Sequence, residues 1–326
     1  MTRWEVFGWQ GDESGCGYYR IKLPMQGLAE LGHTATSGLH VPAEVRDSPD
    51  TVIVGQRICG PASQFWESLA SQGRKIVYDI DDDLWNVDAT STASPQCTPE
   101  RLGEIQRNIE VSTAVTVSTA PLAERIAAWN PNVCIVPNAV PDWLLDHRPQ
   151  SHVDRLTIGW GGSDTHNMDM ERVAAQLKRF INRNTGVEFH CIGTDYGARM
   201  RLPRDKTRFT PWVRDSEAFL RTIDYHIGIA PLRPHIFNQS KSAIKALECG
   251  ALGIPIVASE VRPYEDYVRH GETGYLVRRD HEWGQYLGRL VQDADLRTAM
   301  AQAARKQAAQ HTIAHTAPLW EKAVLG

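Results

Sequence analysis

The stretch that decides the fold is Asn238-Gln-Ser-Lys-Ser-Ala-Ile-Lys-Ala-Leu-Glu-Cys-Gly-Ala-Leu-Gly-Ile-Pro-Ile-Val-Ala-Ser259. Its first part predicts a helix, because Ser240 or Ser242 can cap it and apolar residues recur on one face. Two glycines end that helix, and the apolar run Pro255–Ala258 is typical of a buried strand. The stretch therefore predicts a helix followed closely by a strand of an α/β fold.

Charged side chains mark the same predicted helix. Lys241 lies at its start, and Lys245 and Glu248 are three residues apart on one face. The N–H groups of a helix start, with lysines beside them, suit a diphosphate, and a carboxylate two turns in can accept hydrogen bonds from a ribose diol. Taken alone, the stretch is better explained by an ordinary amphipathic helix with a surface Lys–Glu pair, so the rest of the chain has to decide.

The composition is that of a soluble globular protein with room for two cores. The chain has 326 residues, of which 42% are apolar and 23% charged. Its net charge of −4 argues against a dedicated duplex-DNA binder, although a local basic patch stays open. No apolar run approaches the length of a transmembrane helix, and Met1–Trp9 is too short and too polar for a signal peptide. The six scattered cysteines form no C-x-x-C pair, which predicts reduced thiols in a cytoplasmic protein.

The chain opens with a predicted strand, Trp4–Trp9, a glycine-containing loop and a helix that runs through Leu31. This order is typical of a nucleotide-binding βα unit. The dinucleotide fingerprint needs a third glycine where Arg20 stands, so the sequence supports NAD binding only weakly. Gly15 and Gly17 allow close approach of the backbone to a ligand, with Arg20 as an anion partner on the acceptor or phosphate side. A glycine turn that only reverses the chain is an equally good explanation.

An acidic run, Asp81–Asp83, follows the predicted strand Lys75–Asp81. Carboxylates at the carboxyl end of such a strand lie where open α/β sheets bind ligands. They also resemble a D-x-D metal site, and aspartates equally often cap a following helix. No other acidic or histidine cluster in this half offers further metal ligands. We therefore expect no metal site, and we assign Asp81 and Asp83 to catalysis on the acceptor side of a cleft.

The pattern restarts after the polar stretch Asp146–Arg155, where we predict the boundary between two domains. A strand, a second glycine loop and a helix follow, which puts Gly161, Gly162 and Ser163 at a helix mouth suited to phosphate. His166 adds a donor there, unless it is merely an exposed loop histidine. The predicted domains are 1–147 and 153–310, with a C-terminal helix at 311–326 that packs back on the first domain.

Strands and helices alternate along both halves, which predicts mostly parallel sheets. The remaining predicted strands are 33–39, 51–57, 114–119, 132–137, 156–160, 187–193, 207–211, 225–231 and 275–277. Trp212 and Val213 follow one of these strands, so Trp212 either packs against a nucleotide base or belongs to the core.

Several segments, in this order and at this spacing, resemble glycosyltransferase family 4 (group 1) enzymes of the GT-B fold. The segments are Ile158–Ser163, Asp224–Leu232, Lys241–Glu248, Gly253–Ser259 and Gly271–Leu276, preceded in the first half by Pro137–Val140. The resemblance implies an α/β chain of two Rossmann-like domains, with mostly parallel sheets that face a central cleft. It also implies a nucleotide-diphosphate sugar as donor substrate, no cofactor, and metal-independent transfer that usually retains the anomeric configuration.

The resemblance assigns roles to single residues. It places Glu248 on the donor ribose, the segment Lys241–Ile244 with Ser242 and Ala243 on the diphosphate, and Trp212 and Val213 beside the base. The family motif carries another glutamate where this chain has Ser240. The family's basic pair is replaced too, by Trp160 at one place and Thr165 or His166 at the other. We expect Lys241, Lys245 or His166 to supply the missing charge.

Three functions stay open at this stage. The first is a sugar-transferring enzyme, the second an inactive GT-B module that binds a nucleotide sugar or a partner protein, and the third a nucleotide-sugar epimerase. The acceptor is open as well: a polysaccharide, a lipid, a protein or a modified nucleobase would each fit.

Overall fold

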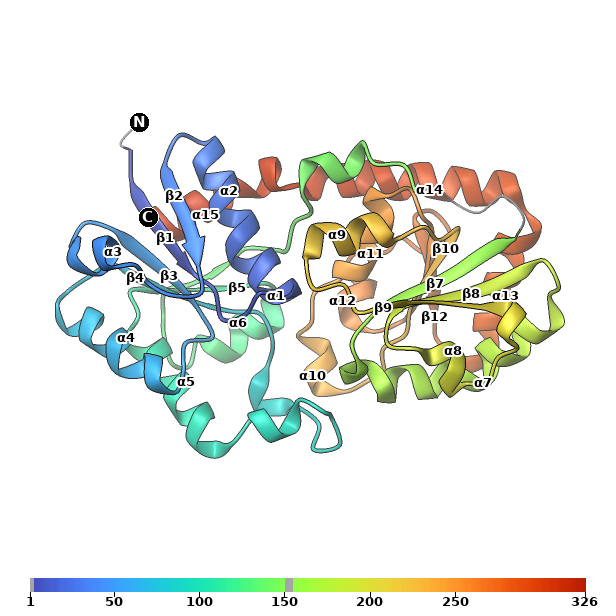
Figure 1. Cartoon of the computed structure of the whole chain (residues 1–326), viewed down its shortest axis with the longest axis horizontal. Coiled ribbons are helices and arrows are strands. Elements are labelled where there is room, and N and C mark those ends of the chain that lie inside the picture. Colours follow the sequence, from blue (N-terminus) through green and yellow to red (C-terminus); the bar gives the residue numbers. More distant parts are fainter. Residues whose placement is uncertain (1–2, 150–154) are drawn as a thin grey trace.

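The computed structural model describes residues 3–149 and 155–326, which form two α/β halves lying side by side (Figure 1). The predicted fold class is confirmed in both halves, because each holds a six-stranded sheet whose neighbouring strands all run parallel. The predicted domain limits, 1–147 and 153–310 with a C-terminal helix at 311–326, stay a prediction. Residues 150–154, part of the predicted boundary stretch, lie outside the described residues.

The first sheet has the strand order β2-β1-β3-β4-β5-β6. Its strands are β1 (Glu5–Trp9), β2 (Thr34–Gly38), β3 (Val52–Gln56), β4 (Ile76–Ile80), β5 (Ala114–Val117) and β6 (Val133–Ile135). Its helices are α1 (Gly15–Gly17), α2 (Leu23–Glu30), α3 (Ala43–Asp47), α4 (Pro61–Ser71), α5 (Pro99–Val111) and α6 (Ala120–Ile126). Every residue of β3 and β4 is buried, since helices cover both faces of a parallel sheet, and this explains their mainly apolar sequences.

The second sheet has the order β12-β11-β10-β7-β8-β9. Its strands are β7 (Leu156–Gly162), β8 (Val187–Gly193), β9 (Thr207–Pro211), β10 (Ile227–Ala230), β11 (Ile256–Ser259) and β12 (Gly274–Val277). The helices are α7 (Asn167–Arg183), α8 (Tyr196–Arg199), α9 (Ser216–Thr222), α10 (Ile236–Gln239), α11 (Ile244–Ala251), α12 (Arg262–Glu265), α13 (Asp280–Gln292), α14 (Ala294–Ala308) and α15 (Ile313–Leu325).

Each sheet has one point where the strand order reverses. In the first half the chain visits the edge strand β2 and returns to β3 on the other side of β1; in the second it visits β8 and β9 and returns to β10 beside β7. Open α/β sheets bind ligands outside the carboxyl ends of their strands at such reversals. We therefore expect ligands to bind at the segments that follow β1 and β3 in the first half, and β7 and β10 in the second.

The last helix crosses back to the first half. α14 runs along the second half, and α15 then lies beside α2 of the first, so the C-terminus ends near the first sheet (Figure 1). Trp320 of α15 is 1% exposed, and the guanidinium of Arg20 lies 4.8 Å from the centre of its ring. The chain thus links the two halves at two places, before β7 and after α14.

The start of the deciding helix differs from the prediction. α11 begins at Ile244 after Ala243, rather than at Lys241, and neither Ser240 nor Ser242 caps it. Hydrogen bonds from the first half hold this segment instead: Thr119 donates to the Ser240 carbonyl at 2.7 Å, and Asn138 donates to the Ser242 hydroxyl at 2.9 Å. Contacts between the halves therefore override the local capping signal.

The first glycine segment also differs from the prediction, because the chain is helical from Gly15 onward. α1 leads into a π-helical turn, Tyr18–Lys22, and then into α2. A Cβ atom at Gly17 would lie 1.9 Å from the carbonyl oxygen of Asp12, so the close packing of this turn requires glycine there. The predicted close approach at Gly17 is to the chain's own backbone.

Candidate functional site

A cavity of about 300 Å³ lies between the carboxyl ends of the two sheets. It is lined from the second half by Gly161, Gly162, Ser163, His166, Trp212, Val213, Lys241, Ser242, Ile244, Lys245 and Glu248, all of which the sequence singled out. From the first half it is lined by the predicted Gly15 and Asp81, together with Cys16, Tyr19 and Asp82. The fold thus gathers most of the predicted residues around one space, while their roles stay predictions.

Lys245 and Glu248, both of α11, line this cavity. The ammonium of Lys245 donates to the carbonyl oxygen of Gly161 at 2.5 Å and lies 5.1 Å from the ring centre of Trp160. Burial lowers the pKa of Lys245, although Glu248 opposes the shift. Burial likewise raises the pKa of Glu248, against the opposing effects of Lys245 and Tyr19. Glu248 is therefore buried and Lys245 half-buried beside one cavity, in contrast to the surface pair that an isolated helix would favour.

A tyrosine from the first half reaches the same carboxylate. The hydroxyl of Tyr19 donates to Glu248 Oε1 at 2.6 Å, and both residues are less than one tenth exposed. Sequence reasoning missed Tyr19, because 229 positions separate the two residues and only the packing of the two halves brings them together.

His166 lies just after the segment Gly161–Ser163, directly before α7, and contacts Asp169. Its Nδ1 is 3.0 Å from Asp169 Oδ2. Burial lowers the pKa of His166 to about 4, and the pKa of Asp169 is also held below its usual value because bonds to His166 and Arg233 outweigh its burial. At neutral pH a neutral ring therefore donates from Nδ1 to an ionised Asp169, which leaves Nε2 as an acceptor. The predicted donor role of His166 toward a phosphate requires a protonated ring.

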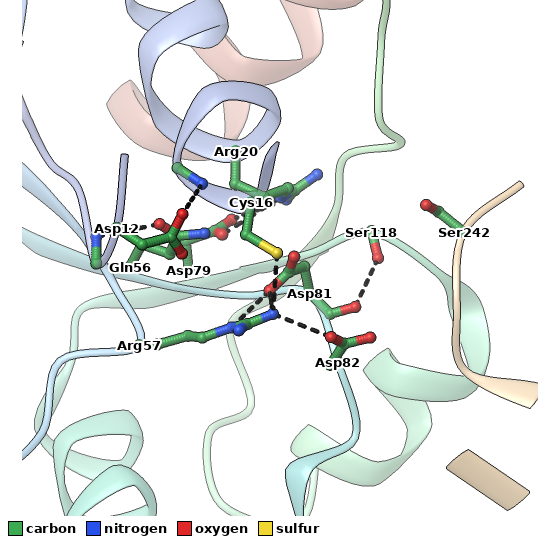
Figure 2. Close-up of polar contacts among 12 residues, drawn as sticks. Asp12, Cys16, Arg20, Gln56, Arg57, Asp79, Asp81, Asp82, Ser118 and Ser242 are labelled. Carbon is green, nitrogen blue, oxygen red and sulfur yellow. Dashed lines mark hydrogen bonds and ion pairs between the residues drawn. The ribbon is translucent and has the colours of Figure 1, made fainter. Parts of the chain in front are cut away.

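Asp81 and Asp82 line the cavity from the first half, and the neighbouring Arg57 contacts both carboxylates (Figure 2). The guanidinium of Arg57 donates from Nε to Asp81 at 2.8 Å and from Nη2 to Asp82 at 3.1 Å, with the thiol of Cys16 beside it. Arg57 has a φ of 50°, a conformation that non-glycine residues adopt mainly at functional or strained positions. Sequence reasoning missed Arg57, because an arginine after a strand carries no signal of its own.

Asp82 also reaches across to the second half. Its Oδ1 lies 3.4 Å from the ammonium of Lys241. Burial disfavours the charged form of Asp82, but Lys241 and Arg57 outweigh that effect and hold its pKa below the usual value. Asp82, rather than Asp81 or Asp83, thus contacts the second half, at the segment predicted to bind the diphosphate.

Four predicted residues lie away from the cavity. Arg20 is fully buried against Asp79, with Nη2 to Oδ2 at 2.8 Å, and also donates to the carbonyl of Val136 at 2.6 Å (Figure 2). It cannot meet a ligand from there, so the anion-partner role is corrected to a structural one. Asp83 is buried, with Arg125 at 3.0 Å and Asn86 at 2.6 Å, and its catalytic role is corrected for the same reason. The other two, Gly17 and Ala243, do not line this cavity.

A second cavity, of about 270 Å³, adjoins the first. The two share Cys16, Asp82, Ser163, Thr165, His166 and Lys241. The walls of the second carry apolar side chains from both halves, among them Leu84, Val87, Leu102, Met168 and Phe237. Two compartments therefore meet at Asp82, His166 and Lys241, which is the arrangement that two substrates of a transfer reaction would need.

Comparison with known proteins finds a family model that matches most of the second half. Residues 155–293 match the family model described as glycosyl transferases group 1. A stretch of 82 residues is 38% identical to the D-inositol 3-phosphate glycosyltransferase of Corynebacterium urealyticum, and one of 83 residues is 40% identical to the enzyme of that name from Stackebrandtia nassauensis. These stretches cover 24% and 25% of the chain, but only 19% and 18% of the relatives' lengths.

Solved structures resemble the whole chain. The sucrose-phosphate synthase of Thermosynechococcus elongatus matches with a TM-score of 0.67 at 14% identity, over 98% of this chain and 96% of that one. The HepE protein of Anabaena in complex with UDP-glucose matches with a TM-score of 0.66 at 13% identity, over 98% and 99% of the two chains. At such identities the likeness shows the fold alone, and that fold is the predicted GT-B arrangement.

Two further observations concern the described residues only. No helix in residues 3–149 and 155–326 is long and apolar enough to cross a membrane. Within the same ranges, no three His, Cys, Asp or Glu side chains are grouped so that they could hold a metal ion.

Proposed function

We propose that the chain is a group 1 glycosyltransferase, whose family model residues 155–293 match, and that it transfers a sugar from a nucleoside-diphosphate sugar to an acceptor. The observation that carries the proposal is that Lys245, which is half-buried, and Glu248, which is buried, line the same cavity between two parallel sheets. A cation and a carboxylate that are partly or fully withdrawn from water and line one open space are arranged for a ligand that carries anionic and hydroxyl groups together.

We further propose that the donor nucleotide is UDP. Solved structures of the same fold, HepE and the TarM protein of S. aureus, contain UDP or UDP-glucose. In this chain Glu248 would receive the ribose hydroxyls, Lys245 would face the diphosphate, and Trp212 would lie against the base. Trp212 is half exposed and lines the cavity, as a side chain that stacks on a ligand must.

The diphosphate would lie between the segment Gly161–Ser163 and the start of α11, which line the same cavity. The N–H groups of Ile244 and Lys245 open α11 and point toward its N-terminal side, whereas those of Ala246 and Leu247 already donate to the carbonyl of Ala243. As the sugar leaves, negative charge grows on the departing diphosphate, and these N–H groups, together with Lys241 and Lys245, stabilise it. No nucleophile from the protein is needed for this step.

The acceptor would enter through the adjoining cavity and meet the donor near Asp82 and His166. The carboxylate of Asp81 accepts from Arg57 Nε at 2.8 Å, so we assign Asp81 to the wall of the acceptor site rather than to proton transfer. We propose metal-independent transfer with retention of anomeric configuration, as the family resemblance implies. Free thiols at all six cysteines favour a cytoplasmic location.

A donor screen by thermal shift tests the proposal. UDP, GDP, ADP and their glucose or N-acetylglucosamine derivatives are compared, because a ligand that binds only the folded state raises the unfolding temperature. We expect stabilisation by UDP and by at least one UDP-sugar, followed by turnover on an acceptor panel that includes a phosphorylated polyol, since the curated relatives are named for such an acceptor. Activity that persists in EDTA would support metal independence. A screen without any stabilising nucleotide would contradict the proposal.

One observation favours a second candidate, an inactive module that binds a nucleotide sugar. Ser240 stands where the family motif carries a glutamate; it is 5% exposed and does not line the donor cavity. Without that carboxylate, the chain lacks the side chain with which the family motif contacts the sugar, whereas the residues proposed to bind the nucleotide are present. Nucleotide binding without hydrolysis or transfer, across the full donor and acceptor panel, would favour the module over the enzyme.

A further inference from the structure

The hydrogen bond from Tyr19 to Glu248 connects the first half to the predicted nucleotide site. It is 2.6 Å long, and it joins the π-helical turn before α2 to the middle of α11. Glu248 is 7% exposed and Tyr19 8%, so water competes little for this bond. A hydrogen bond to a charged group in such surroundings is among the stronger ones in proteins.

Tyr19 is held in place by its neighbours along the chain. Arg20 is anchored by Asp79 and by the carbonyl of Val136, both of the first half. On the other side, the ring of Tyr18 lies edge-on to that of Tyr19, with 5.1 Å between the ring centres. The anchored turn fixes where the Tyr19 hydroxyl lies, and the hydroxyl in turn orients the carboxylate.

Only one oxygen of that carboxylate is engaged. Oε1 accepts from Tyr19, and within the described part of the chain no hydrogen bond reaches Oε2. Both residues line the cavity, so the second oxygen is available to a ligand there. A fixed carboxylate with one engaged and one open oxygen is pre-organised for a single hydroxyl in one direction.

We propose that Tyr19 is a positioning residue for the donor nucleotide: its hydroxyl fixes Glu248 Oε1 so that Oε2 meets a ribose hydroxyl. The inference rests on the proposed function and adds to it that the first half, assigned to the acceptor, takes part in nucleotide recognition. It also makes ribose recognition depend on the two halves being packed together, because Tyr19 and Glu248 come from different halves.

Loss of the tyrosine hydroxyl has a chemical consequence at Glu248. Burial raises the pKa of Glu248, and the bond from Tyr19 and the charge of Lys245 lower it. The other titratable groups near the carboxylate are Cys249 on the same helix, Tyr225 and Tyr264. Without the Tyr19 bond, Glu248 takes up a proton at higher pH, and a protonated acid is a weaker acceptor for a ribose hydroxyl.

The test is the affinity for UDP of Tyr19→Phe, measured by calorimetry between pH 5 and pH 8. We expect a loss of about tenfold at pH 7, which corresponds to one hydrogen bond to a charged group. We also expect the fall of affinity on the acid side to move to higher pH. Tyr18→Phe is the matched control, since it removes a hydroxyl one residue away that is buried and has no partner among the described residues. Its affinity and pH profile should equal those of the wild type.

A double-mutant cycle with Glu248→Gln completes the experiment. If Tyr19 acts through the carboxylate, its replacement by Phe should have little further effect in the Gln background, and the difference that this replacement makes to the pH profile should vanish there. Equal affinity and equal pH profiles for Tyr19→Phe and Tyr18→Phe would overturn the inference while leaving the proposed function intact. A wild-type protein that binds none of the nucleotides in the donor screen would overturn both.

Discussion

At the scale of single residues, the site depends on side chains whose ionisation is set by burial. Lys245 and Glu248 share the end of a cavity, and each has its charged form disfavoured by the loss of water. Such groups are costly to a fold unless they are paired, and their presence in a cavity is a frequent mark of a functional site. Two predictions concern such residues individually.

Lys245→Met should lower the turnover of the sugar transfer by about 100-fold, the typical effect of removing one group that stabilises charge in a transition state. Methionine keeps the apolar stem over Trp160 but removes the ammonium that would face the departing diphosphate. Lys306→Met, on an exposed position of α14, is the control and should leave turnover unchanged. Steady-state kinetics with the best donor of the screen provide the measurement. Equal turnover in the two variants would remove Lys245 from the mechanism.

His166→Gln should flatten the dependence of folding stability on pH. Burial lowers the pKa of His166 from 6.5 to about 4, so the unfolded chain binds the proton more tightly than the folded one. Stability contributed by the neutral ring is therefore complete above pH 6.5 and is lost as the pH falls toward 4. Between pH 7 and pH 5 the variant should lose roughly 2 kcal/mol less unfolding free energy than the wild type.

The measurement for this prediction is urea unfolding of both proteins at pH 7 and pH 5. His281→Gln replaces an exposed histidine and serves as the matched variant, with the wild-type dependence expected. The same pH dependence in all three proteins would refute the burial of a neutral His166.

At the scale of elements, the C-terminal helix α15 holds the first half in shape. Trp320→Ala should destabilise the protein by about 3–5 kcal/mol, because it empties a fully buried site and removes the ring that lies against Arg20. Leu319→Ala, on the same helix at 45% exposure, should change stability by about 0.5 kcal/mol or less. Chemical denaturation compares the two. A small loss at Trp320 would mean that α15 is not part of the first core.

The regular elements could be predicted from the sequence because their signals are local. The run Val52–Gln56 is buried throughout and mostly apolar, and β7 begins at the predicted Leu156. The start of α11 could not be predicted, since bonds from Thr119 and Asn138 in the other half fix the residues before it. The helices α3, α8 and α10 have only four or five residues, too few to show a periodic pattern.

In the site, too, residues with a local sequence signal could be predicted, and residues fixed by distant contacts could not. Residues at or just beyond the carboxyl ends of strands, such as Gly161 and Asp81, could be found because strand ends are where parallel sheets bind ligands. Arg20 was misjudged because its partner, Asp79, lies 59 positions away inside a strand, and nothing local shows that an arginine will be buried. Tyr19 was missed because its contact exists only when the two halves are packed together.

At the scale of the whole molecule, bonds across the interface connect the two halves around the cavities. Lys241 approaches Asp82 at 3.4 Å, and Arg233 pairs with Asp88 at 2.6 Å, each pair joining one half to the other. In the function proposed above, most donor-binding residues come from the second half, and Tyr19 and the wall of the acceptor site come from the first. In this account, transfer therefore depends on both halves at once, and the cavity between them is the place to test it.

The central claim is that this cavity is the donor nucleotide site and that Glu248 holds the ribose. Calorimetric titration of UDP into the wild type and into Glu248→Ala tests it most directly. We predict saturable binding by the wild type and an affinity at least about tenfold lower in the variant, because a buried carboxylate that accepts from a ligand hydroxyl contributes about 1.5 kcal/mol or more. Equal affinity for UDP in the two proteins, with the variant folded, would contradict the claim.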